Sequence, residues 1–260
     1  MTRPVPRRIE EYYRERYYGG RHSFTRRFCT WRRRRLLRKY AGRGGRLLDV
    51  GSGEGDFVHA ATQDGWEAAG VEIHRTASAS QHRVFPSLEE AGMLAPFRCI
   101  TLWHVLEHVP DPRAQLIQLR AALERDGVII VAVPDFGGAQ ARIFGSNWLH
   151  LDVPRHLHHF TQSGLTHLFE LTGFDVVRVS NQELEYDLFG WIQSALNALT
   201  RMPNVLFDAL TGKPPRVGRA SVAASYAAAC ALAMPSLLMT FAASLLRRGG
   251  TIIVVARPRQ

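Results

Sequence analysis

The stretch Leu47-Leu-Asp-Val-Gly-Ser-Gly-Glu-Gly-Asp-Phe57 joins a short apolar strand to the start of a helix through three glycines. Glycine lets the backbone turn sharply, and it lets a ligand approach the backbone because no Cβ is in the way. The free N–H groups at the start of the helix favour a polar or anionic group. Glu72 ends the next strand, where a carboxylate can accept hydrogen bonds from both ribose hydroxyls of an adenosine ligand. We therefore expect this loop to bind an adenosine-containing ligand.

The spacing of the glycines argues against a dinucleotide site. The pyrophosphate fingerprint requires glycine in the last place of G-x-G-x-x-G, and that place is Asp56 here. The spacing is instead G-x-G-x-G, with Asp49 two residues before the first glycine. An ordinary glycine turn between a strand and a helix is the other interpretation. The strand context, together with Asp49 and Glu72, favours a binding site over it.

Apolar strands alternate with helices along the chain. The pattern predicts helices after the glycine loop to Gln63, from Pro112 to before Gly127, and over 161–172, and strands over 46–50, 67–73, 98–103, 128–133, 174–179 and 251–256. Before them, residues 9–40 are predicted to form two helices, the second beginning near Ser23. Repeated alternation of this kind predicts an α/β fold with a parallel sheet covered by helices on both faces.

Charge and composition divide the chain into three parts. Residues 1–44 carry 15 of the 33 Lys and Arg but only 3 of the 23 Asp and Glu, so they form a basic helical segment. The α/β core is assigned to 45–182 and 250–258, and an apolar helical insertion to 183–249. The basic segment suits nucleic acid, an anionic membrane surface or a solvated helix face.

The cysteines and the first residues favour a cytoplasmic protein. Cys29, Cys99 and Cys230 lie far apart and form no C-x-x-C pair, which argues for a reducing compartment and against a cysteine-based zinc site. The first eight residues, MTRPVPRR, contain no apolar core, so we expect no secretory signal peptide.

Four motifs, in this order, resemble those of the class I S-adenosylmethionine (SAM) dependent methyltransferases. They are Leu47–Phe57, Gly70–Ile73, Phe97–Pro112 and Leu123–Asp135, which look like the first motif and the motifs of the second, fourth and fifth strands. The chain is most similar to the ubiquinone-biosynthesis-like branch, whose members often carry a stretch like Trp148–Phe160 (WLHLDVPRHLHHF). The resemblance implies SAM as cofactor and a Rossmann-like, mostly parallel sheet of seven strands, with the helical insertion between the last two.

The resemblance also implies roles for individual residues. Asp49 would orient the ammonium group of SAM, and Glu72 would bind its ribose. Trp103 and His104, just past the fourth strand, would flank the methionyl part and the methyl-transfer site. The backbone of the loop would hold the methionyl moiety, through Gly51, Ser52, Gly53 and Gly55.

Two groups of histidines are candidates for the base that removes a proton from the acceptor. His104 and His108, with Glu107, follow the fourth strand, and a second group lies between His150 and His159 after the fifth strand. The second group matches no established zinc pattern, and we expect no metal. We predict His156 and His104 as catalytic residues, and Arg155 and His159 as substrate contacts.

The expected reaction is methylation of an oxygen or carbon atom in a lipophilic small molecule. The alternative is a nucleic-acid methyltransferase that grips phosphates through the basic N-terminus. Methyltransferases of exocyclic amines carry Asn/Asp-Pro-Pro-aromatic after the fourth strand, and Leu-Trp-His-Val over 102–105 argues against them. A SAM-binding regulator without turnover is a third hypothesis.

The insertion contains 27 consecutive uncharged residues, Ala220 to Leu246, flanked by Arg219 and by Arg247-Arg248. As a helix they would measure about 40 Å, enough to cross a hydrocarbon core of about 30 Å. Pro235 interrupts the run, and the other apolar segment, 188–200, is too short to cross back. The amphipathic pattern of residues 188–200 leaves two interpretations of the insertion. One is a helical lid or homodimer interface, and the other is a peripheral patch on an anionic membrane surface.

Overall fold

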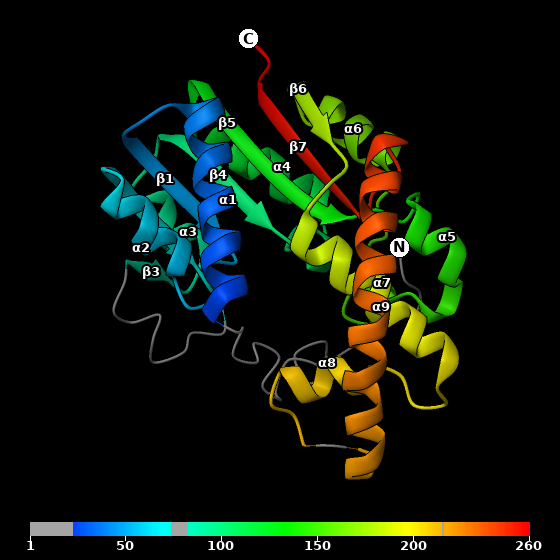
Figure 1. The fold of residues 1–260 in the computed structure, drawn as a ribbon. Coiled ribbons are helices and arrows are strands. Elements are labelled where there is room, and N and C mark those ends of the chain that lie inside the picture. Colours follow the sequence, from blue (N-terminus) through cyan, green and yellow to red (C-terminus); the bar gives the residue numbers. More distant parts are fainter. Residues whose placement is uncertain (1–22, 74–82, 215) are drawn as a thin grey trace. The chain divides into compact units, whose positions relative to one another are not determined.

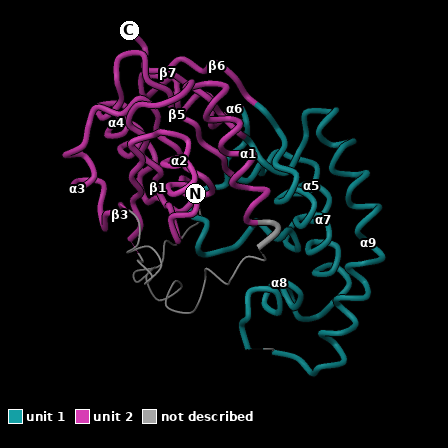
Figure 2. The backbone as a smooth tube through the Cα atoms, turned by 60° about the vertical axis from the view of Figure 1, so that its left-hand side comes forward, with its two compact units in different colours: residues 1–25, 134–162, 180–252 teal, residues 26–133, 163–179, 253–260 magenta. Residues whose placement is uncertain are grey.

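The computed structural model describes residues 23–73, 83–214 and 216–260. The predicted helix before Ser23 lies outside these residues. The chain divides into two compact units, which are described separately (Figure 2). Of the described residues, unit 1 comprises 23–25, 134–162, 180–214 and 216–252, and unit 2 comprises 26–73, 83–133, 163–179 and 253–260.

A seven-stranded sheet forms the centre of unit 2, in the order β3-β2-β1-β4-β5-β7-β6 (Figure 1). Neighbouring strands from β3 to β5 are parallel, whereas β7 runs opposite to β5 and β6. The predicted α/β fold is therefore confirmed. The strands are β1 (Gly45–Val50), β2 (Trp66–Val71), β3 (Val84–Phe85), β4 (Phe97–Trp103), β5 (Leu123–Pro134), β6 (Phe174–Ser180) and β7 (Thr251–Pro258).

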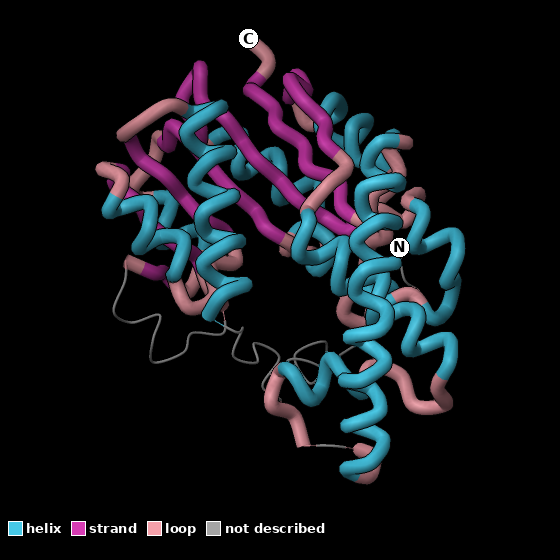
Figure 3. Tube along the Cα trace, viewed as in Figure 1, coloured by secondary structure: helices cyan, strands magenta, loops and turns pink. Residues whose placement is uncertain are grey.

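Helices cover both faces of this sheet (Figure 3). Side chains of α1 and α2 pack with β1, β4 and β5 in one buried apolar cluster, which includes Leu37, Phe57 and Ile130. Asp111 caps α4, because its carboxylate accepts a hydrogen bond from the Ala114 amide and Pro112 begins the helix. The helices are α1 (Ser23–Ala41), α2 (Asp56–Gln63), α3 (Leu88–Gly92), η3 (Leu106–His108), α4 (Pro112–Ala121) and α6 (Gln162–Leu171).

Strand β5 begins five residues earlier than the sequence predicts. The predicted strand started at Val128, where the continuous apolar run begins, but the observed strand starts at Leu123, which pairs with Phe97 of β4. The charged residues 124–126 are partly or fully exposed, so this end of the strand lies at the edge of the buried core. A polar, half-solvated strand end has no apolar run to reveal it.

Unit 1 contains the helical insertion that the sequence predicts between the last two strands. It consists of α7 (Leu184–Leu199), α8 (Val205–Leu210) and α9 (Arg219–Leu245), and unit 1 also contains α5 (Ala139–Phe144), η4 (Gly145–Asn147) and η5 (Leu149–Leu151). Ile192 and Leu196 of α7 and Leu206 of α8 form a small apolar core, against which α9 packs. The predicted amphipathic helix over 188–200 is the main part of α7.

A buried carboxyl group fixes the start of α7 within unit 1. Asp187 accepts hydrogen bonds from the hydroxyl of Thr251 and from the amide of Glu183, while its own carbonyl accepts one from Gln140. Burial raises the pKa of Asp187 to about 7, against the opposing effect of these donors. Through its carboxylate and its carbonyl, Asp187 thus bonds α7 to Thr251, the first residue of β7, and to Gln140 of α5.

Candidate functional site

The glycine loop of unit 2 is left-handed at three positions. Gly51, Gly53 and Gly55 have φ values of 71°, 57° and 84°, a region that side chains disfavour. A Cβ on Gly51 would lie 2.3 Å from Cγ2 of Val105, so the protein itself requires glycine there. A Cβ on Gly53 would meet no atom of the described residues within 4 Å. These residues therefore leave space beside Gly53 for a ligand to approach the backbone.

Hydrogen bonds hold this loop against the end of β2. The amides of Gly51 and Ser52 both donate to the carbonyl of Val71, at 2.8 and 3.0 Å. A Cβ on Gly70 would lie 2.4 Å from Oγ of Ser52, so a glycine in β2 makes room for the loop. The buried hydroxyl of Ser52 has no hydrogen-bond partner among the described residues. It is thus a polar group that a ligand could satisfy.

Glu72 lies directly beside the loop, as the sequence predicts. Its carboxylate is buried and accepts a hydrogen bond of 2.9 Å from the amide of Gly53. This bond joins the end of β2 to the glycine that faces open space. A carboxylate in this position can accept further hydrogen bonds from a sugar hydroxyl.

Asp49 is a second buried carboxylate at the same edge. The hydroxyl of Thr101, on the adjacent strand β4, donates to its Oδ1 at 2.6 Å. Burial raises the pKa of Asp49 to about 6, while the charge of Arg33 and the Thr101 hydrogen bond act in the opposite direction. Asp49 is therefore mostly ionised at neutral pH and attracts a cation.

Arg33 is a site residue that the sequence analysis missed. It comes from α1, and its guanidinium lies 4.8 Å from the centre of the Trp103 ring. Its Nε is buried and has no hydrogen-bond partner among the described residues. The sequence contains a signal for the inward position of Arg33, because this residue continues the four-residue spacing of the buried residues Cys29, Leu37 and Ala41.

Trp103 is the last residue of β4, and His104 follows it, at the end of the fourth strand to which the resemblance points. Trp103 is buried, contacts Phe57 edge to face, and its indole N–H has no hydrogen-bond partner among the described residues. His104 has a φ of 56°, which is uncommon for a residue with a side chain. Its Nδ1 lies 3.7 Å from Oε1 of the buried Glu107 in η3. The carboxylate can therefore orient the imidazole and stabilise its charged form.

His156 belongs to unit 1, and its environment selects one tautomer. Its Nδ1 lies 2.7 Å from the carbonyl oxygen of His150. Because a carbonyl can only accept, Nδ1 carries the proton, and Nε2 is the unprotonated nitrogen of the neutral ring. Asp152 Oδ2 is 3.9 Å from Nε2, and the ring is buried. Neutral His156 is thus able to accept a proton at Nε2.

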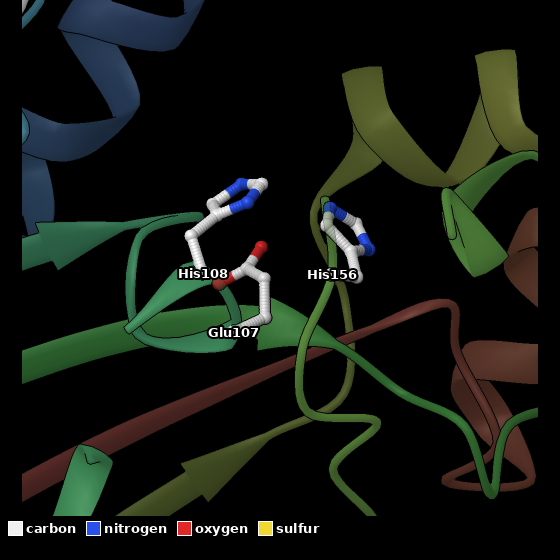
Figure 4. Close-up of side chains that lie close together, drawn as sticks. All are labelled: Glu107, His108 and His156. Carbon is white, nitrogen blue, oxygen red and sulfur yellow. The ribbon is translucent and has the colours of Figure 1, made fainter. Parts of the chain in front are cut away.

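The two predicted substrate contacts are engaged within the same segment of unit 1. Arg155 forms a two-pronged ion pair with Asp152, in which its Nε donates to Oδ2 at 2.9 Å. His159 Nε2 donates to the carbonyl of Leu151 at 2.8 Å. Their role toward a substrate remains a prediction. Figure 4 shows three side chains of types that can also ligate metals, namely Glu107 and His108 of η3 in unit 2 and His156 of unit 1.

Comparison with known proteins identifies the family. Residues 21–179 match the family described as "Methyltransferase domain". No curated protein matches the sequence. One similar solved structure is a SAM-dependent methyltransferase from Archaeoglobus fulgidus, with 18% identity, a TM-score of 0.55, and coverage of 95% of this chain and 99% of that chain. Another is the 1,6-didemethyltoxoflavin-N1-methyltransferase of Burkholderia thailandensis with bound S-adenosylhomocysteine, with 16% identity, a TM-score of 0.55, and coverage of 100% of this chain and 94% of that chain. A third is phosphoethanolamine N-methyltransferase 2 of Haemonchus contortus with SAM, with 16% identity, a TM-score of 0.56, and coverage of 88% of this chain and 52% of that chain.

These solved structures share the fold of this chain, but their sequence identity to it is too low to indicate a substrate. The family match extends over more than half of the chain, from α1 to the end of β6. The predictions of a methyltransferase and of SAM as its cofactor agree with this match. The chain belongs to the methyltransferase-domain family, with the fold of the class I SAM-dependent enzymes.

Proposed function

We propose that this protein transfers the methyl group of SAM to an oxygen or carbon atom of a lipophilic small molecule. The observation that supports the cofactor site most directly is the open space at Gly53, which is next to the buried carboxylate of Glu72. The acceptor class rests on the resemblance of Trp148–Phe160 to the ubiquinone-biosynthesis-like branch. A quinone precursor or a lipid-linked compound would be such an acceptor.

The described residues of unit 2 fit SAM by charge and by hydrogen-bonding type. Glu72 would accept hydrogen bonds from the ribose hydroxyls, and Asp49 would attract the ammonium group. Ser52 and Trp103 offer buried polar groups without a partner among the described residues. The guanidinium of Arg33 would pair with the carboxylate of SAM. SAM supplies an electrophilic methyl group on a positively charged sulfur. The protein must align that group and exclude water.

We assign His156 as the general base, with Nε2 taking the proton of an acceptor hydroxyl. The bond from Nδ1 to the His150 carbonyl supports this role, because it keeps Nε2 unprotonated in the neutral ring. Arg155 and His159 are proposed to contact the acceptor. His104 is the second candidate base, oriented by Glu107.

We expect SAM affinity to fall as the pH falls through about 6. The pKa of Asp49 is raised to about 6, so the group loses its charge below that pH and no longer attracts the ammonium of SAM. Calorimetry across the range from about pH 5 to about pH 7 measures the effect. Asp49→Asn should bind weakly at every pH, with a flatter profile. Equal affinity of the wild type at both ends of the range would contradict the assignment.

Labelled SAM tests the acceptor class. The protein is incubated with SAM labelled in the methyl group and, separately, with cell lipids, quinone precursors, RNA and protein. We expect label in the lipid or quinone-precursor fraction. Label in RNA would instead support the nucleic-acid alternative, which the basic N-terminal segment keeps open.

A further inference from the structure

The two faces of α9 have opposite characters. Its most buried residues are small, namely Ser225, Ser236, Thr240 and Ala243. Large apolar residues are exposed instead, at spacings of four, three and four along the helix, which puts them within about 60° of one another around its axis. These residues are Met234 (63% exposed), Leu238 (63%), Phe241 (49%) and Leu245 (86%), and we refer to them as the α9 stripe.

This arrangement is the reverse of that in a helix on a water-soluble surface, which buries its large apolar side chains. Within unit 1 the small face of α9 packs against α7 and α8. Its hydroxyl groups are satisfied locally, since Ser225 donates to the carbonyl of Ser221 and Thr240 to that of Ser236. Small residues between helices and large apolar residues outside are typical of helices in contact with lipid.

The charges along the sequence of α9 and its flanks are of one sign. Residues 209–260 contain no Asp or Glu. Arg219 at one end of the helix and Arg247 and Arg248 just beyond the other are exposed. An apolar helix with arginines at both ends is complementary to an anionic bilayer, where the arginines meet headgroups and the stripe meets acyl chains.

Length and hydropathy alone would allow α9 to cross a membrane, since it has 27 residues and a mean hydropathy of 1.7 in its most apolar window. The packing argues against crossing. Ala228, Ala229 and Leu232 pack on the core of α7 and α8, so one side of the helix is covered by protein that carries charged residues such as Asp208. The stripe side, in contrast, is exposed.

We propose that the α9 stripe binds the surface of an anionic membrane, lying in the boundary between headgroups and acyl chains. A second copy of the chain is a poorer occupant of this face. Both ends of α9 are basic, so a two-fold pairing along the helix would bring arginine close to arginine in either orientation. The interaction would bring this peripheral protein to a lipophilic acceptor, but it does not depend on the proposed methyl transfer.

A fluorophore on Cys230 reports directly on this contact. Cys230 is exposed on α9, one turn before Met234, whereas Cys29 and Cys99 are buried, so an environment-sensitive thiol dye can be attached selectively. The labelled full-length chain is mixed with phosphatidylcholine vesicles, with or without about 30% phosphatidylglycerol. We expect a blue shift and co-sedimentation with the anionic vesicles, decreasing with salt. Unchanged emission and a soluble protein at low salt would overturn the proposal.

Variants of the stripe test which face makes the contact. The triple variant Leu238→Ser, Phe241→Ser and Leu245→Ser should reduce vesicle partitioning about tenfold or more, because these side chains would no longer enter the acyl region. All three residues are exposed, so the fold should persist, and circular dichroism checks this. Partitioning equal to that of the wild type would assign the contact elsewhere.

A matched control removes the same number of exposed apolar side chains from unit 2. Met93→Ser, Leu171→Ser and Val177→Ser change residues that are 78%, 58% and 54% exposed, and they should leave partitioning unchanged. An equal loss in this control would show a general effect of surface hydrophobicity and overturn the proposal.

The flanking arginines test the preference for negative charge. Arg247→Gln together with Arg248→Gln should lower binding to anionic vesicles by about fivefold per arginine, with little change for neutral vesicles. Light scattering measures whether a second copy of the chain occupies this face instead of a membrane. A dimer of the wild type that the triple stripe variant cannot form would assign the face to a second copy. Because none of these measurements involves SAM, their failure leaves the proposed methyl transfer untouched.

Discussion

Replacing Glu72 with alanine is expected to weaken SAM binding by about 1.5–3 kcal/mol, which is about 10- to 150-fold in affinity. The buried carboxylate accepts a hydrogen bond from the Gly53 amide and is proposed to accept others from the ribose hydroxyls. Alanine removes all of these acceptors and leaves the Gly53 N–H without its partner. Calorimetric titration with SAM measures the loss.

Glu67→Ala is the matched control for this prediction. Glu67 lies on β2, the strand that Glu72 directly follows, but its exposed carboxylate pairs with Arg46 and Arg83 on the surface. Its removal should leave SAM affinity unchanged, since surface ion pairs contribute little. If Glu72→Ala also binds SAM normally, the ribose assignment is wrong.

The local part of the cofactor site could be predicted from the sequence because it depends on short-range features. The left-handed turns at Gly51, Gly53 and Gly55 need residues without a Cβ, and their spacing between a strand and a helix is visible in the sequence. Glu72 follows from the end of the next strand. Parallel pairing of β1 and β2 then brings the two together, as the bond from Gly53 to Glu72 confirms.

Features that depend on packing were harder to predict. Strand β3 is only Val84–Phe85, too short for any period to appear. Arg33 lies in a run of four arginines, and its four-residue spacing from the buried Cys29 and Leu37 is what separates it from its neighbours. The tautomer of His156 depends on the carbonyl of His150, which a turn of the chain brings to it. The hydrogen-bond partner of a ring nitrogen cannot be deduced from residue types.

The insertion contains both a feature that the sequence predicts and a feature that depends on packing. The uncharged run predicted α9 almost to the residue, because charges mark its two ends. The face that the helix buries could not be predicted, since alanine and serine occur along its whole length, and leucine and methionine are spread over more than one side of its second half. Packing against α7 and α8 selected the small residues. The exposed stripe is therefore a property of the fold, which composition alone does not show.

Replacing His156 with alanine is expected to lower kcat by about 10²- to 10⁴-fold, the contribution of a positioned general base. SAM affinity should stay unchanged, because the groups proposed to bind SAM belong to unit 2, whereas His156 belongs to unit 1. Turnover with an acceptor from the labelling experiment, together with calorimetry, separates the two effects. His158→Ala is the control, since this neighbouring ring stacks on Phe160.

A conservative substitution distinguishes a base from a structural residue. His156→Asn can still donate from its amide to the carbonyl of His150, the bond that Nδ1 makes in the wild type, but it has no nitrogen in place of the basic Nε2. If His156 is the base, asparagine should be as inactive as alanine. The fall of kcat at acid pH that protonation of a histidine base causes in the wild type should then disappear. If asparagine restores turnover, His156 only supports its loop. A loss confined to His104→Ala would then move the base to His104, beside Glu107.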